Sequence, residues 1–255
     1  MLSVTNAKLA GFLPRWASFR GFTILFDNLG ESCIGAGPLR TLSTDPALDF
    51  YASLSAHLTC LDLDVLTNTY LFCSLPPPSY HVTVCDGVND GNLGQLPHSE
   101  RDEMSAFLDG LPASLASPPA LLAVVARSSL VVEPWPIRFR YDRLVLWSHS
   151  ALVATLVPAD AEPAAALQRL EAARRELAAH FQEQYNFGVG TRYVPHVTLG
   201  YFANREGAQL ALPSLAAWDS AFSAGMAGKV LEFSRASLYG FTDMATFMTL
   251  AGSQS

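Results

Sequence analysis

Hydrophobic residues recur along the chain with two different periods, and these separate predicted helices from predicted strands. Between residues 163 and 185 they return at helical spacing, so this segment is predicted to form one long helix with a single buried stripe. The β-prone runs Ile137–Trp147 and 151–157 flank Ser148-His149-Ser150, a combination typical of a β-hairpin. Further strands are predicted at residues 22–26, 69–75, 80–85, 193–202, 231–238 and 245–250, and further helices at residues 47–60, 100–108 and 215–226.

Proline and glycine clusters indicate where these elements should end. Pro76-Pro77-Pro78 stops the strand predicted at 69–75, residues 86–92 are rich in turn formers, and residues 112–119 are predicted to form a loop. Helices and strands alternate without a glycine-rich phosphate loop. The pattern therefore favours an α+β fold with largely antiparallel sheets.

The composition fits one compact domain spanning residues 1–255, because half of the residues are hydrophobic and only 15% are charged. A net charge of −7 argues against salt-driven binding to long nucleic acid, which needs clustered lysines and arginines. A small phosphorylated ligand stays compatible, since a few local donors suffice for one phosphate. The sequence has no run of about 20 apolar residues, and its first 26 residues show no continuous apolar segment, so no secretory leader is expected. We therefore expect a cytoplasmic protein without membrane contact.

The four cysteines lack the close spacing of a metal site and are expected to be free thiols in a reducing compartment. They are Cys33, Cys60, Cys73 and Cys85. No motif with metal-ligand spacing is found either, so neither a metal nor another cofactor is expected.

One short pattern occurs twice, once in each half of the chain. The first copy is Tyr80-His81-Val82-Thr83-Val84, and the second is Pro195-His196-Val197-Thr198-Leu199. Residues i and i+2 of a strand lie on the same face, so each histidine should share a face with its threonine. The intervening apolar residues then point into the core. Two such strands side by side would present two imidazoles and two hydroxyls to one cleft.

Two histidines suit the cleavage of a phosphodiester without a metal. An imidazole has an ordinary pKa of about 6.5, so near neutral pH one ring can be neutral and the other protonated. The neutral ring removes a proton from water and the charged ring donates one to the leaving alkoxide. Threonine hydroxyls can bind the non-bridging phosphate oxygens. The sequence thus predicts that His81 and His196 are the acid–base pair, with Thr83 and Thr198 beside them.

The duplicated motif resembles that of the 2H phosphoesterase superfamily, which includes RNA 2′-5′ ligase-like proteins and cyclic nucleotide phosphodiesterases. The stretches SYHVTVCDGVNDGN and LEFSRASLYGFTDMATF are most similar to a poorly characterised bacterial and fungal branch. The resemblance implies a bilobal, pseudo-symmetric fold with two antiparallel sheets, outer helices and a central cleft. It also implies that His81 and His196 are catalytic, and that Thr83 and Thr198 bind phosphate.

Other residues have weaker claims to a functional role. Tyr80 and Tyr239 are candidates for stacking on a nucleobase, and a structural role in the core is the alternative for both. Arg138 and Arg140 share a strand face and could border the cleft, but a solvated face is the favoured interpretation. Cys85 shares the face of His81, yet it lacks a third, orienting group and is interpreted as a structural thiol.

The predicted function is hydrolysis of a small nucleotide phosphodiester, with a 2′,3′-cyclic phosphate as the leading substrate. Alternatives are cleavage of 2′-5′ linked or cyclic oligonucleotides, RNA end joining, and non-catalytic nucleotide binding. The expected partner is a nucleotide or short oligonucleotide, and a monomer is favoured.

Overall fold

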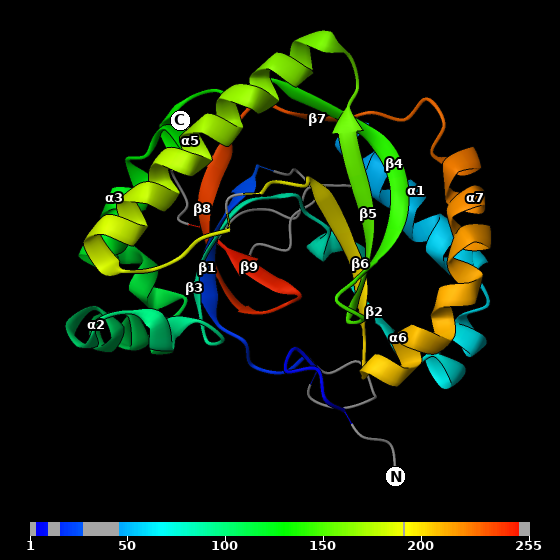
Figure 1. Ribbon diagram of the computed structural model, residues 1–255, viewed down its shortest axis with the longest axis horizontal. Coiled ribbons are helices and arrows are strands. Elements are labelled where there is room, and N and C mark those ends of the chain that lie inside the picture. Colours follow the sequence, from blue (N-terminus) through cyan, green and yellow to red (C-terminus); the bar gives the residue numbers. More distant parts are fainter. Residues whose placement is uncertain (1–3, 10–15, 28–45, 191, 250–255) are drawn as a thin grey trace.

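Two antiparallel sheets, with helices on their outer sides, form the frame of the computed structural model, which describes residues 4–9, 16–27, 46–190 and 192–249 (Figure 1). The four-stranded sheet has the order β3 (Thr83–Asn89), β1 (Gly21–Phe26), β8 (Ala236–Asp243) and β9 (Thr246–Met248). The five-stranded sheet has the order β2 (Phe72–Ser74), β6 (His196–Phe202), β5 (Ala151–Pro158), β4 (Ile137–Trp147) and β7 (Leu231–Phe233). Every strand pair in both sheets is antiparallel, as predicted.

The helices lie in two groups outside the sheets. They are α1 (Pro46–Cys60), α2 (His98–Asp109), α3 (Ala120–Ala126), α4 (Ser129–Val132), α5 (Ala161–Tyr185), α6 (Arg205–Ala211) and α7 (Leu215–Gly225). Short turns of 3₁₀ or π-helix occur at Val65–Thr69, Pro77–Ser79, Leu93–Gln95, Ala113–Ala116 and Leu212–Ser214. In Figure 1, α1, α6 and α7 flank the five-stranded sheet, and α2 and α3 flank the four-stranded one. Within the described ranges, no helix has both the length and the apolar character needed to cross a bilayer.

The strongest predictions from the hydrophobic pattern are confirmed. The hairpin of β4 and β5 turns at Ser148 and His149, whose positive φ angles of 51° and 50° match the twist of the flanking strands. The long helix α5 buries one stripe of its surface. That stripe comprises Leu170, Ala173, Leu177 and Phe181.

Two predictions near the first motif are wrong in part. Only Phe72–Ser74 of the strand predicted at 69–75 is extended, because Val65–Thr69 forms a helical turn just before it. The turn predicted at 86–92 begins only at residue 90, because β3 continues through Asn89. Gly87 permits this: a Cβ there would lie 2.3 Å from the Phe22 ring of the neighbouring strand, a contact that only glycine tolerates. Tertiary pairing therefore overrides the local turn preference.

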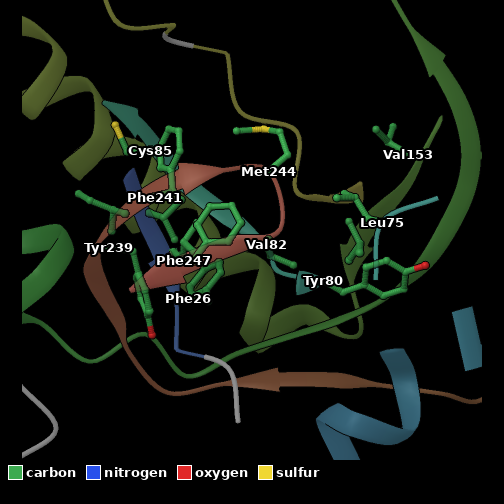
Figure 2. Close-up of a cluster of buried hydrophobic side chains, with 14 of the residues drawn as sticks. Phe26, Leu75, Tyr80, Val82, Cys85, Val153, Tyr239, Phe241, Met244 and Phe247 are labelled. Carbon is green, nitrogen blue, oxygen red and sulfur yellow. The ribbon is translucent and has the colours of Figure 1, made fainter. Parts of the chain in front are cut away.

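An antiparallel bridge joins the two sheets at the motifs themselves. Val82 pairs with Val197 in antiparallel geometry, and both side chains are fully buried. The carbonyl of Val82 also accepts a hydrogen bond of 3.1 Å from the Phe26 amide of β1. Figure 2 shows Val82 within an apolar cluster that includes Phe26 and Phe247. This packing fixes both motif strands relative to each other.

Candidate functional site

The four motif side chains face one another across the bridge between the sheets. If the antiparallel register of the valine pair is continued by one residue in each direction, His81 stands opposite Thr198. In the same way, Thr83 stands opposite His196. Since alternate residues point to opposite faces, all four polar side chains lie on the face away from the valines. The two motifs thus place two imidazoles and two threonine hydroxyls together on one face.

These four side chains face a pocket of about 240 Å³ between the sheets. It is lined by His81, Thr83, His196 and Thr198, together with Lys8, Asp86, Trp147, Tyr201, Phe241, Met244, Phe247 and eight further residues. All four motif side chains are half-buried. Among the residues that the structure describes, neither threonine hydroxyl has a hydrogen-bond partner, so both can bind a ligand.

Both histidines are held by the same local hydrogen bond. Nδ1 of His81 donates to the Ser79 carbonyl at 2.7 Å, and Nδ1 of His196 donates to the Val194 carbonyl at 2.9 Å. A carbonyl can only accept, so Nδ1 carries the proton in each neutral ring. The Nε2 atom of each ring is therefore the one that can take up or release a proton.

An aromatic ring packs against each imidazole. The ring centroids of His81 and Phe247 are 4.4 Å apart, and those of His196 and Trp147 are 4.1 Å apart. Phe247 comes from β9 and Trp147 from the end of β4, so each sheet supplies one of these contacts. Together with the hydrogen bonds at Nδ1, they fix the orientation of both rings.

Burial lowers the pKa of both histidines. The pKa of His81 falls to about 4, because removal from water disfavours the charged ring and the nearby charge of His196 adds to this effect. Burial also lowers the pKa of His196, while its bond to Val194 and the carboxylate of Asp86 act in the opposite direction. The two imidazoles therefore stand in different electrostatic environments.

Lys8 is a member of this pocket that sequence reasoning missed. Its Nζ lies 3.4 Å from the Tyr201 hydroxyl and 4.8 Å from the centroid of the Tyr201 ring. Its charge contributes to the lowered pKa of both histidines, so it lies within electrostatic reach of them. A lone lysine more than seventy residues before the first motif offers no sequence pattern that would have identified it.

The two candidate stacking tyrosines lie outside this pocket. Tyr80 is 1% exposed and packs edge-on against Tyr51. Tyr239 is 5% exposed, and its hydroxyl donates to Asp27 at 3.1 Å. Figure 2 shows the two side chains on opposite sides of the apolar cluster. Neither is among the residues that line the pocket. The structure therefore gives both of them a place in the core.

The remaining candidates are also placed by the structure. Arg138 is paired with Asp160 and Glu232 on the surface, and neither it nor Arg140 lines the pocket. Cys85 is buried, and burial raises the pKa of its thiol to about 11. The described residues contain no cluster of three or more histidine, cysteine or acidic side chains that could hold a metal ion. Cys33 lies outside the described residues.

Fold and site together define an α+β protein in which two antiparallel sheets enclose a pocket with two histidines. A similar fold occurs in ATU0111, a conserved protein of unknown function from Agrobacterium tumefaciens str. C58. Its crystal structure gives a TM-score of 0.51, at 14% sequence identity, with 96% of this chain and 90% of that chain covered. This likeness concerns the fold alone. No protein-family model and no curated protein matches the chain.

Proposed function

We propose that this protein is a two-histidine phosphodiesterase that acts on a small nucleotide. The observation that carries the proposal is the convergence of both motifs on one pocket, with each imidazole held at Nδ1. Two fixed imidazoles supply a base and an acid, which is what cleavage of a phosphodiester requires. The bilobal, pseudo-symmetric architecture of 2H phosphoesterases, expected from the motif resemblance, is part of this proposal.

The proposed reaction is an in-line displacement at phosphorus. One imidazole takes a proton from water at Nε2, the water oxygen forms a bond to phosphorus, and the bond to the leaving oxygen breaks. The other imidazole, protonated at the start, gives its Nε2 proton to the leaving alkoxide. Thr83, Thr198 and the ammonium of Lys8 bind the non-bridging oxygens, where negative charge accumulates. No step requires a metal.

Turnover of 2′,3′-cyclic nucleotides in excess EDTA tests this proposal. His81→Ala and His196→Ala should each lower kcat/KM by about 10² to 10⁴-fold, because each removes one of the two proton-transfer groups. His98→Ala is the matched control, since His98 is exposed on α2 and outside the pocket, and it should keep wild-type turnover. Activity that EDTA abolishes, or that either pocket variant keeps, contradicts the mechanism.

The substrate panel also separates the proposal from its alternatives. Hydrolysis of 2′-5′ linked or cyclic oligonucleotides in place of cyclic mononucleotides would keep the mechanism and change the substrate. Joining of RNA ends would identify the reverse reaction. Tight nucleotide binding with no turnover of any diester would identify a binding module and reject the catalytic proposal.

A further inference from the structure

A second, larger pocket of about 680 Å³ opens directly beside the histidine pocket. The two pockets share Thr83, Asp86, Trp147 and His196. His81, by contrast, lines only the smaller one. A ligand whose phosphate contacts the four motif side chains therefore has continuous space on the His196 side. The small pocket suits one phosphate group, and the large pocket has room for a further part of the same molecule.

A buried arginine lines this larger pocket without a compensating carboxylate. Arg174 of α5 is 7% exposed, and its Nε donates to the Val84 carbonyl at 2.6 Å. Its Nη2 donates to the Gly190 carbonyl at 3.2 Å, but its buried Nη1 has no acceptor. Within the described part of the chain, no carboxylate lies within ion-pair distance of the guanidinium. The thiol of Cys85 lies close by, but a neutral thiol leaves the positive charge uncompensated.

Buried charges are normally paired, so an uncompensated guanidinium beside a pocket is a mark of anion binding. The guanidinium stacks on the ring of Tyr193 at 4.4 Å, and the Tyr193 hydroxyl donates to the Thr83 carbonyl at 3.0 Å. The guanidinium of Arg174 is thus held at Val84, the residue that follows the motif threonine Thr83 in β3. Arg192 lines the same pocket, is exposed, and has no ion-pair partner among the described residues.

The other charges of the pocket fit the rest of a nucleotide. Arg143 is paired with Asp142 at 2.9 Å, which leaves Asp86 and Glu171 as the acidic lining groups without an ion pair in the described ranges. Carboxylates accept hydrogen bonds from ribose hydroxyls and base amino groups, whereas arginines bind phosphate. A pocket with both kinds of group matches a nucleotide unit better than it matches a simple anion.

We propose that the larger pocket is a second nucleotide subsite, in which Arg174 and Arg192 bind a second phosphate of the substrate. This inference rests on the proposed function, because it takes the first phosphate to lie between the two motifs. The substrate class is then a phosphodiester that carries at least one further phosphate, such as a short oligonucleotide.

Calorimetric titration with nucleotides that contain no diester tests the subsite without turnover. The probes are adenosine 3′,5′-bisphosphate and, for comparison, 3′-AMP and 5′-AMP, all at one low salt concentration. The wild type should bind the bisphosphate at least about tenfold more tightly than either monophosphate. Arg192→Gln should reduce this ratio to below about threefold, because a charge-assisted contact to the second phosphate is lost.

Arg175→Gln is the matched control, since it removes the same charge from an exposed position of α5 outside the pocket and should leave the ratio unchanged. Arg174→Gln should also lower the ratio. If it fails to fold, Arg192→Gln still decides the question, because Arg192 is exposed. Equal affinities in the wild type, no binding of any probe, or an unchanged ratio in Arg192→Gln each overturn the subsite. If the wild type prefers the bisphosphate to both monophosphates but turns over no diester, the proposed function is rejected and the subsite is retained.

Discussion

His81 and His196 are the residues on which the proposed chemistry depends, and their surroundings repeat in a revealing way. Each Nδ1 is bound by a carbonyl two residues earlier in the chain, and each ring packs on an aromatic side chain. The surroundings differ in charge, since the carboxylate of Asp86 acts to raise the pKa of His196, whereas the charge of His196 acts to lower the pKa of His81. Two identical side chains can therefore stay in different protonation states, which acid–base catalysis needs.

The pH dependence of catalysis should reflect these shifts. The profile of kcat/KM reports the free enzyme, in which both histidines have pKa values below the ordinary 6.5. The singly protonated pair is then most populated on the acid side of pH 6.5, and kcat/KM should fall as the pH rises above it. A bound phosphate favours imidazolium, so the kcat profile should extend to higher pH. Initial rates between pH 4 and 8 check this, and a flat profile would contradict the mechanism.

Stability should also depend on His81 at acidic pH. Its pKa is lower in the folded state than in the unfolded chain, so the unfolded state binds the proton more readily. The contribution of neutral His81 to the free energy of unfolding is then fully present above about pH 6.5. As the pH falls towards 4, up to about 3 kcal/mol of this contribution is lost. Urea unfolding at pH 7 and pH 4 should show a smaller loss in His81→Gln than in the wild type. An equal loss in both proteins would mean that His81 is not the group responsible.

The sequence predicted the four motif residues because both copies follow the two-residue period of a strand. It did not predict Lys8, Trp147 or Arg174, because each reaches the pockets from a segment whose position depends on tertiary packing. Tyr80 and Tyr239 were proposed from sequence proximity, which says nothing about the direction of a side chain. Neighbours along the chain are therefore weaker guides to a site than residues repeated in the same local context.

At the scale of elements, β6 carries the second motif and depends on a glycine for its pairing with β2. A Cβ at Gly200 would lie 2.4 Å from the Cys73 carbonyl oxygen and from the Phe72 ring. The sheet can close at this position only because the side chain is absent. The hydrophobic pattern located β6 well but gave no indication of this requirement, which arises from a strand more than a hundred residues away.

Gly200→Ala should destabilise the protein by about 1 to 3 kcal/mol, because overpacking forces the neighbouring strand to move. Gly94→Ala is the matched control, since a Cβ there meets nothing within 4 Å. That variant should change stability by less than about 1 kcal/mol, towards stabilisation if at all. Denaturant unfolding of both variants measures the difference. A Gly200→Ala variant as stable as Gly94→Ala would show that β2 does not pack on β6 as described.

At the scale of the whole molecule, both sheets are built from segments distant in sequence. The four-stranded sheet joins β1 and β3 to β8 and β9, and the five-stranded sheet joins β2 to strands from the second half. The alternation of helices and strands predicted the fold class correctly, but it could not predict this interleaving. Strand order depends on long-range contacts that local patterns do not encode.

Neither of the two fragments made by cutting the chain before β6 should fold alone. A fragment of residues 1–189 lacks β8 and β9 of one sheet and β6 and β7 of the other. Circular dichroism should show no cooperative unfolding for fragments 1–189 and 190–255 made separately, and neither should cleave a phosphodiester. Cooperative melting of either fragment would contradict this prediction, because it would mean that the strands of that fragment fold without their partners from the other fragment.

The contact between Trp147 and His196 gives the site an optical property. Indole emission is sensitive to a positive charge placed against the ring, and the two ring centroids are 4.1 Å apart. The part of the emission that comes from Trp147 is the part lost in the Trp147→Phe variant. This emission should therefore change when His196 is protonated, and it should change again when a phosphate enters the pocket. The protein thus carries its own unlabelled probe of the proton that the proposed reaction must move.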